Sequence, residues 1–193
     1  MGAGVADIVR AAADGSQSAW DDLVDRYAGL VWSVCRAHHL SQADAADVSQ
    51  TVWLRLVEHL HRLRDPERVG SWLATTARHE CYRVLRLSGR QVPTADDDLD
   101  GDGVATAVLP RPEEGLLRDE RDRLLWQALA GISSRCQALL RLLLADPPPS
   151  YEDASAALDM PVGSIGPTRA RCLERLRAKA EAAGITAAAG DSG

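Results

Sequence analysis

The chain has 193 residues, which is enough for one ordinary domain or two small ones. Its apolar share of 46% can build real cores, and because aromatic residues make up only 4%, aliphatic side chains must fill them, which favours small helical domains. The net charge of −6 does not exclude a nucleic-acid partner, because residues 92–122 concentrate the acidity and residues 123–180 carry more basic than acidic side chains.

The cysteines and the apolar runs bear on compartment and cofactors. The four cysteines stand far apart and form no CxxC pair: Cys35, Cys81, Cys136 and Cys172. We therefore expect no disulfides, no cofactor or metal, and a reducing cytoplasm. A metal cluster of Cys35 with nearby histidines is the alternative, but no second thiol has ligand spacing. No leader pattern or bilayer-spanning apolar run is found, so we expect a cytoplasmic protein without membrane insertion.

The first half of the chain has the periodicity of helices. Residues 5–13 form a short helical pattern, and Ser16 or Ser18 can cap a following helix whose apolar positions extend to Val34. Residues 43–63 form a long amphipathic pattern. Its polar face includes Leu54, which has no obvious intramolecular reason to point outward.

A break at residues 64–70 precedes another helix. Pro66 disfavours helix at the residue before it and Gly70 marks the exit, so Ser71 is expected to cap a helix that runs to about Leu87. One side of this helix is apolar, and the other is lined by Arg78, Arg83, Arg86 and Arg90. Such a helix can pack on a core and present guanidinium groups to phosphates. Residues 1–90 are expected to form one all-helical domain.

Residues 91–114 differ in character, with three prolines and the acidic run of residues 96–102. This composition cannot bury enough surface to order itself, so it predicts a flexible acidic linker. Residues 115–180 return to helical patterns at 115–130 and 136–144, followed by two helices, 150–158 and 164–179, that a tight turn joins as a helix-turn-helix. Residues 181–193, rich in Ala and Gly, are expected to be a flexible tail.

The last helix has the pattern of a recognition helix. Ile165, Cys172, Leu173 and Leu176 are expected to cluster inward. A single outward face is expected to carry hydroxyls near the helix start and arginines further along: Ser164, Thr168, Arg171 and Arg175. A solvated arginine face on an ordinary helical hairpin is the alternative.

Taken in order, these stretches resemble a bacterial RNA polymerase sigma factor of the extracytoplasmic-function (ECF) group of the sigma-70 family. Residues 44–56 resemble that family's core-polymerase-binding helix, residues 63–73 and 77–79 its −10 loop and helix, and residues 150–177 its −35-reading motif. The resemblance implies an all-α fold of two small helical domains, region 2 and region 4, joined by the linker.

The resemblance also implies partners and site residues. Core polymerase, through its beta and beta-prime subunits, and promoter DNA are the expected partners, and family members are commonly held by an anti-sigma factor. Asp47, Gln50, Leu54 and Glu58 would bind core polymerase. The −10 element would contact Asp65, Arg68, Gly70, Arg78, His79, Arg83 and Arg86, and the −35 element would contact the four outward residues of the last helix.

Departures and alternatives remain. Ala46 stands where the family often has an acidic residue. In the last helix, Gly166-Pro167 replaces the family's usual pair of a basic residue and Ser. If Ser164 is the N-cap, Pro167 lies in the first helical turn, where its missing N–H has no helical partner to lose. The sequence shows no nucleophile–base pair and no phosphate-cradling loop. We therefore expect that the protein is not an enzyme by itself. The alternative function is a stand-alone helix-turn-helix regulator that binds DNA without polymerase.

Overall fold

The structure is a computed structural model that describes residues 4–89, 120–146 and 148–185, and in these ranges it contains helices and no strands. The expected all-α fold is therefore confirmed. The predicted linker, residues 91–114, and most of the predicted tail lie outside the described residues.

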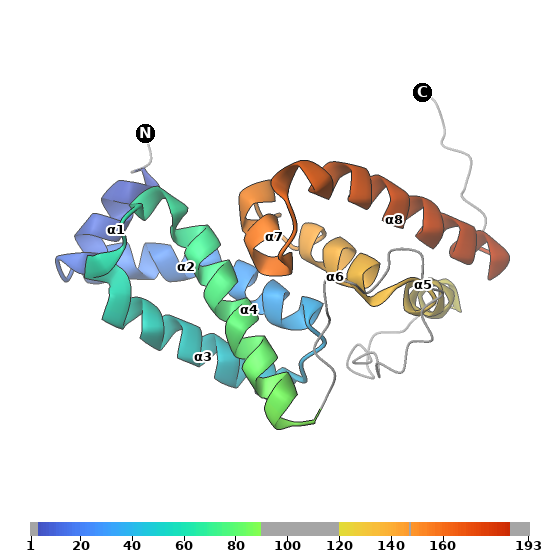
Figure 1. Cartoon of the computed structure of the whole chain (residues 1–193), viewed down its shortest axis with the longest axis horizontal. Coiled ribbons are helices and arrows are strands. Elements are labelled where there is room, and N and C mark those ends of the chain that lie inside the picture. Colours follow the sequence, from blue (N-terminus) through green and yellow to red (C-terminus); the bar gives the residue numbers. More distant parts are fainter. Residues whose placement is uncertain (1–3, 90–119, 147, 186–193) are drawn as a thin grey trace.

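Four helices make up the N-terminal part: α1 Val5–Ala13, α2 Gln17–Ala37, α3 Gln42–His59 and α4 Val69–Leu87 (Figure 1). Local sequence sets where they begin. The Ser16 hydroxyl accepts the Ala19 N–H at the start of α2, and the Ser41 hydroxyl accepts the Asp44 N–H at the start of α3, so each serine satisfies a backbone donor that the helix leaves unpaired.

The connection from α3 to α4 is made of two short 3₁₀ helices, Leu60–Arg62 and Pro66–Arg68, and α4 follows the second of them without a break. The expected cap at Ser71 is therefore wrong. Pro66 supplies the fixed φ angle of a helix start, so the chain turns helical before it reaches the serine.

The C-terminal part holds α5 Glu120–Ala130, α6 Ser134–Leu143, α7 Tyr151–Leu158 and α8 Val162–Ala182. The hydroxyls of Ser133 and Ser150 cap α6 and α7. Asp159 ends α7 in the left-handed conformation, with φ 54° and ψ 52°, and so turns the chain into α8. The predicted helix-turn-helix is present.

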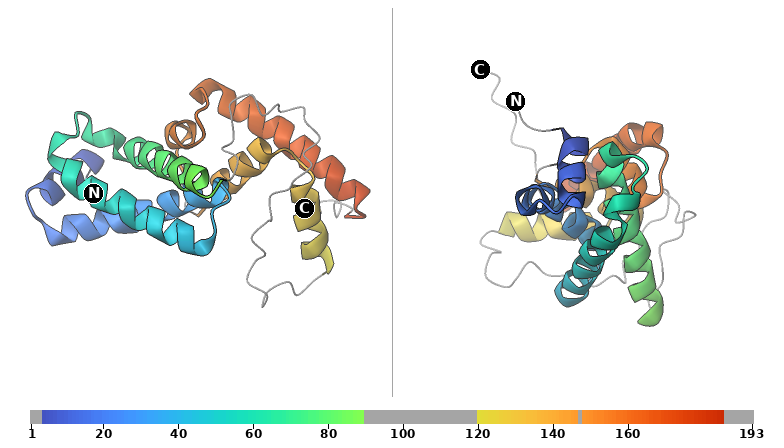
Figure 2. Two further views of the ribbon diagram at one scale, coloured as in Figure 1. Left: turned by 60° about the horizontal axis from the view of Figure 1, so that its bottom comes forward. Right: turned by 90° about the vertical axis from the view of Figure 1, so that its left-hand side faces the viewer.

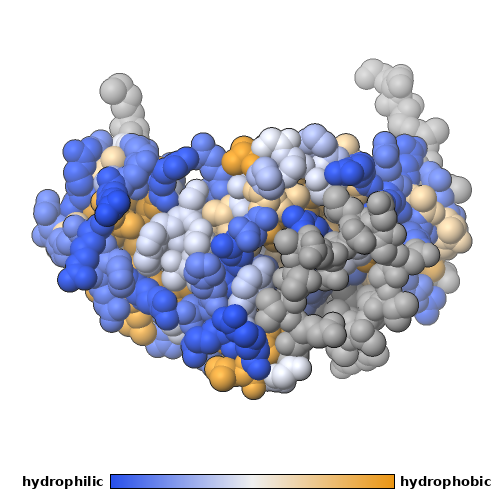
Figure 3. Space-filling model, in the orientation of Figure 1, coloured by the Kyte–Doolittle hydropathy of each residue, from blue (hydrophilic) through white to orange (hydrophobic). Residues whose placement is uncertain are grey.

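One hydrophobic core spans both parts of the chain. It contains Leu23, Leu56 and Leu73 from the N-terminal helices and Leu139 and Ile165 from the C-terminal ones, all fully buried. The N-terminal and C-terminal parts meet where α4 packs against α7 and α2 packs against α6. Figures 1 and 2 show α7 beside α4 at the centre of an elongated molecule. On the face drawn in Figure 3, hydrophobic residues reach the surface only in small separate areas.

The expectation of four unbonded cysteines is wrong for one pair. Cys136 of α6 and Cys172 of α8 form a disulfide, whereas Cys35 and Cys81 are buried free thiols. A hydrogen bond with Cys35 and burial both raise the pKa of the Cys81 thiol, which keeps it protonated. Sequence spacing could not reveal the disulfide because its two cysteines, 36 positions apart, meet only when α8 packs on α6.

Candidate nucleic-acid and protein interface

The outer face of α3 carries the four residues expected to bind core polymerase. Asp47, Gln50, Leu54 and Glu58 are all exposed, and Leu54 keeps 58% of its surface in water. Val57 is 55% exposed beside Leu54. Two exposed aliphatic side chains among carboxylates are typical of a protein-binding surface, since a purely solvated helix face gains nothing from them.

The loop before α4 presents residues of both charges. Asp65 and Arg68 are exposed and face each other at 4.0 Å, the limit of an ion pair, so this pair adds little stability. Gly70 is buried: a Cβ there would lie 2.8 Å from an Asp153 carboxylate oxygen and 2.9 Å from the Tyr27 ring. A larger residue here would require the Asp153 and Tyr27 side chains to shift.

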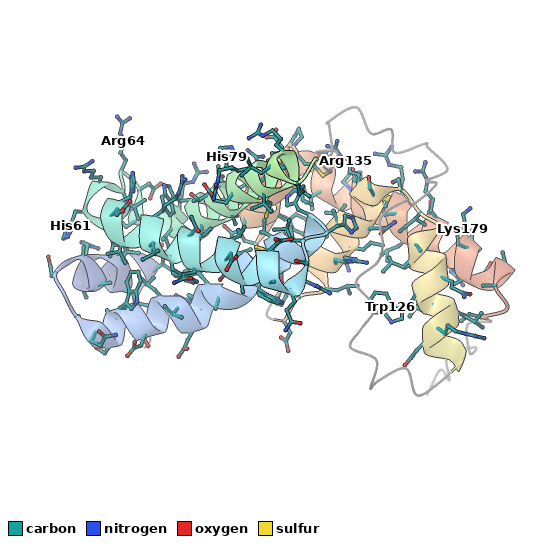
Figure 4. All side chains as sticks on the ribbon, turned by 90° about the horizontal axis from the view of Figure 1, so that it is seen from below. His61, Arg64, His79, Trp126, Arg135 and Lys179 are labelled. Atoms are coloured by element: carbon teal, nitrogen blue, oxygen red, sulfur yellow. A yellow bond between two sulfur atoms is a disulfide. The ribbon has the colours of Figure 1, made fainter. Side chains whose placement is uncertain are left out.

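The basic side of α4 is held in place by a buried carboxylate. Glu80 is 2% exposed and pairs with Arg55 of α3 at 2.6 Å and with Arg83 of α4 at 2.7 Å. Two guanidinium partners compensate the burial of this charge. The pairing orients Arg83 at the surface, where His79 and Arg86 are also exposed, and Figure 4 shows His79 on α4.

Arg78 does not lie on this exposed side. Its whole-residue exposure is only 9%, and its guanidinium donates to the Asp159 carboxylate at 2.8 Å. The expected arginine-lined edge is therefore wrong at this position, because α7 packs on α4 there and covers the side chain. Periodicity places a residue on a helix face but cannot say which second helix covers that face.

The inward face of α8 is formed by Ile165, Thr168 and Cys172, each at most 1% exposed. Thr168 was expected to point outward with Arg171, and this is wrong: Arg171 is exposed, but it donates to the buried Thr168 hydroxyl at 3.4 Å. Leu173, expected inside, is 42% exposed. The helix is rotated relative to the sequence expectation because the disulfide and Ile165 fix which side meets α6.

The start of α8 also differs from expectation. Pro161 is the N-cap, and the Ser164 hydroxyl donates to the Pro161 carbonyl at 2.7 Å instead of capping the helix. Pro167 therefore lies inside the helix, past its first turn, and cannot bond to the Gly163 carbonyl. Gly163 is exposed, so water can satisfy that carbonyl.

Several small and basic residues are exposed in the first half of α8. Gly163, Pro167 and Ala170 are exposed near the helix start, with Arg169 and Arg171 exposed to either side of them. Arg175 is half-buried and engaged by other groups. Arg169 is an exposed basic residue that the sequence analysis missed, because its position four residues after Ile165 places it close to the buried side of the helix in the sequence pattern.

The described ranges contain no group of three His, Cys, Asp or Glu side chains that could hold a metal ion. None of the helices described is long and apolar enough to cross a membrane. Figure 4 shows Trp126 of α5 and Lys179 of α8 in the C-terminal part of the chain, and the Arg141 guanidinium lies 5.9 Å from the Trp126 ring centre.

Comparison with known proteins shows which proteins the chain resembles. Residues 23–91, which include α3 and α4, match the family Sigma-70 region 2. The chain is 26% identical over 156 residues to the ECF RNA polymerase sigma-E factor of Escherichia coli (strain K12), covering 78% of this chain and 81% of that protein. The sigma-E factor of Haemophilus influenzae (strain ATCC 51907 / DSM 11121 / KW20 / Rd) is 24% identical over 177 residues, covering 89% and 93%.

The fold has a match among solved structures. The structure of CnrH in complex with the cytosolic domain of CnrY superposes with a TM-score of 0.59 at 18% identity, covering 92% of this chain and 97% of CnrH. The chain is thus similar to sigma factors of the sigma-70 family, through the region 2 match of residues 23–91 and an all-helical fold that ends in a helix-turn-helix. The relatives that it resembles along most of its length are ECF sigma factors.

Proposed function

We propose that this chain binds core RNA polymerase, directs it to specific promoters and helps to melt the −10 element. The observation that carries the proposal is the exposed face of α3, where Leu54 and Val57 stand among Asp47, Gln50 and Glu58 inside the region 2 match. Such a face suits contact with a protein partner, and the named relatives are RNA polymerase sigma factors. No observation favours a stand-alone helix-turn-helix regulator.

The work is divided between the two parts of the chain. In the proposed division, residues 1–90 form region 2, residues 91–114 a linker, residues 115–180 region 4 and residues 181–193 a tail. Asp65 to Gly70 would hold a base extruded from the −10 element, with Arg78, His79, Arg83 and Arg86 on its backbone and bases. In region 4, α8 would read the −35 element with Arg171, and Ser164 and Arg175 would contact it at its margins.

The energetics require the polymerase. Extruding a base costs a few kcal/mol and DNA stacking is worth about 1.4 kcal/mol per step, so a domain of this size cannot open several base pairs alone. Core enzyme supplies the remainder through its own contacts with the DNA. The chain itself needs no catalytic group for this role, and the role places it in the cytoplasm with the chromosome. An anti-sigma factor is the expected regulator.

In-vitro transcription with purified core polymerase and a promoter library tests the proposal. Wild-type protein should support initiation at a defined set of promoters, and Leu54→Asp should abolish binding to core enzyme because it puts a charge at the centre of the contact. Leu87→Asp is the matched control, since Leu87 is also an exposed leucine, at 77%, but lies at the end of α4. Initiation nowhere with the wild-type protein would refute the proposed function.

A further inference from the structure

A covalent bond ties α8 to α6. The disulfide joins Cys136, in the first turn of α6, to Cys172, in the middle of α8, and both cysteines are fully buried. The proposed function places the chain in the cytoplasm, where thiols are kept reduced and disulfides are usually transient, catalytic or redox-sensing. The bond is therefore one that a cell can form and break, and its state bears on the helix that would read the −35 element.

Helix α8 is intrinsically weak on the N-terminal side of this bond. Gly163, Gly166 and Pro167 all lie within residues 162–171, and glycine and proline are the residues that favour helix least. Pro167 also lacks the N–H that would bond to the Gly163 carbonyl. Residues 173–179, with the sequence Leu-Glu-Arg-Leu-Arg-Ala-Lys, consist only of types that favour helix. Cys172 thus stands at the boundary between a weak half and a strong half.

Few side chains hold the weak half of α8 to the core. Within residues 162–172, the buried ones are Ile165, Thr168 and Cys172. Ile165 and Thr168 make non-covalent contacts that a local opening can break, whereas the disulfide keeps Cys172 on α6 in every opened form. Segments with few buried contacts open at the lowest free energy, so residues 162–171 are the part of α8 that loses most when the bond is reduced.

We propose that Cys136 and Cys172 are a thiol-oxidation site that controls promoter recognition: the oxidised chain keeps residues 162–171 helical and able to bind the −35 element, and the reduced chain releases them. The proposal rests on the proposed function of α8. Arg169 and Arg171 are exposed within the released segment, so reduction disorders two of the basic side chains that α8 would present to DNA.

The two other cysteines are not part of this site. Cys35 and Cys81 are free thiols that are fully buried in the N-terminal helices. A hydrogen bond with Cys35 and burial raise the pKa of the Cys81 thiol, and a protonated thiol does not attack a disulfide. The disulfide therefore exchanges with thiols from solution, not with the second pair of the same chain.

The chemical step is exchange with a low-molecular-weight thiol and its disulfide. In reduction, the thiolate of one small thiol attacks a sulfur of the bond, the bond between Cys136 and Cys172 breaks, and a mixed disulfide forms. A second small thiol displaces the first, so one small disulfide leaves, and the two small thiols have supplied two electrons and two protons. Oxidation is the reverse, with the small disulfide as the electron acceptor. Local opening of residues 162–171 gives the small thiol access to the buried sulfurs.

Hydrogen exchange followed by mass spectrometry tests the release on the full chain, without DNA or polymerase. The wild type is compared after treatment with oxidised glutathione and after treatment with dithiothreitol. Reduction should speed the exchange of residues 162–171 at least about fivefold, the lower end of typical coupling between sites, and leave α2 unchanged. Cys136→Ser with Cys172→Ser should exchange like the reduced wild type after either treatment. A bond that dithiothreitol does not reduce in the folded chain, or equal exchange of residues 162–171 in both forms, would overturn the proposal.

A glycine substitution tests whether the weak half of α8 is the reason. A Cβ at Gly166 would meet only the Tyr151 ring, at 4.0 Å, so Gly166→Ala fits and strengthens the helix. In the reduced chain it should slow the exchange of residues 162–171 about fivefold, the ratio that the alanine–glycine difference in helix propensity gives. Gly29→Ala is the matched control, since that glycine lies inside α2 and its Cβ would also have room, at 3.7 Å from the nearest atom. Equal slowing by both variants would contradict this cause.

Promoter use tests the consequence. The chain is oxidised or reduced first, the small molecules are removed, and core polymerase is then added with a promoter selected from the library, intact or with its −35 element scrambled. The reduced wild type should initiate at least about fivefold less than the oxidised wild type on the intact promoter, and both forms should be equally poor on the scrambled one. The double serine variant shows any effect of the treatments on the polymerase itself. Equal initiation by both wild-type forms on the intact promoter would overturn the control of recognition.

The two proposals fail in different ways. If both wild-type forms initiate equally at defined promoters, the sigma function stands and the redox control is refuted. If reduction releases residues 162–171 but neither form initiates anywhere with core polymerase, the thiol pair does control α8, and the proposed function of that helix is refuted.

Discussion

Burial decides the charge of His38. The residue is 4% exposed at the end of α2, and its environment lowers the pKa of its imidazole from 6.5 to about 4. Desolvation by burial lowers this pKa the most, and the nearby Arg78 guanidinium lowers it further. The hydrogen bond with the Ala157 carbonyl acts in the opposite direction and raises it. The edge of the ring contacts Tyr82, and the pKa of the adjacent His39 is also lowered, to about 4. Both rings are neutral at pH 7.

This predicts acid sensitivity. The unfolded chain binds protons at His38 below pH 6.5, whereas the folded chain does so only below about 4, so stability falls as the pH drops through this window. From pH 7.5 to pH 5, His38 should reduce the free energy of unfolding by about 2 kcal/mol. Denaturant titration at both pH values measures it. His38→Gln should lose that share of the pH dependence and retain the share of His39; an unchanged dependence would contradict the assignment.

Arginines on α8 and α4 should differ in what they contribute to binding. Arg171 is exposed beside the outward face of α8, so Arg171→Ala should cost roughly 1–3 kcal/mol of discrimination between promoters if the guanidinium reads a base. Arg86→Ala should instead weaken binding to all sequences similarly and flatten its salt dependence, as loss of a phosphate contact does. Binding of polymerase–sigma complexes to matched and mismatched promoters, across a salt series, measures both. Equal weakening on all sequences by Arg171→Ala would exclude base readout.

At the scale of elements, an ion pair and a covalent bond each join two helices. Glu80 ties α4 to Arg55 of α3, and the disulfide ties α6 to α8. The second contact bears on recognition, because it fixes which side of α8 faces away from the core. It also compensates for Pro167, which removes one hydrogen bond from the helix interior, a change that costs up to about 3 kcal/mol in a helix.

Breaking the disulfide should therefore weaken the C-terminal helices. Cys136→Ser with Cys172→Ser, or reduction of the wild-type protein, should lower the free energy of unfolding by about 2–4 kcal/mol, since the unfolded chain regains the freedom of a closed loop. Denaturant titration with and without reductant measures the loss. Cys35→Ser is not a suitable control, because that thiol is buried. The double variant serves instead: its free energy of unfolding should no longer change when reductant is added. A continued change would point to another bond.

At the scale of the whole molecule, one core connects parts of the chain that the sequence presents as separate. Leu30 and Val34 of α2 belong to the same buried cluster as Leu139 and Leu142 of α6. Because burial of apolar surface is the main favourable term in folding, helices that share a core stabilise one another. The two parts are therefore coupled as long as the α4–α7 and α2–α6 contacts are formed.

Coupling of this kind predicts a single thermal transition for the wild-type chain. Asp159→Arg should weaken the coupling and separate the transition into two, one for each set of helices. Differential scanning calorimetry measures this, with Asp22→Arg as a surface charge change of the same size. A single transition in Asp159→Arg with an unchanged midpoint would show that this ion pair does not join the two parts.

The sequence alone determined the helices and their order, because apolar periodicity is local, and serine caps located the starts of some of them, such as Ser16 and Ser150. It also singled out Leu54, since an apolar residue on a polar helix face is visible without coordinates. The tertiary structure decided the rest: that Cys136 meets Cys172, that Thr168 faces the core, and that Arg78 is covered by α7. Each of these depends on which helix packs on which, and that is set by contacts between residues far apart in the chain.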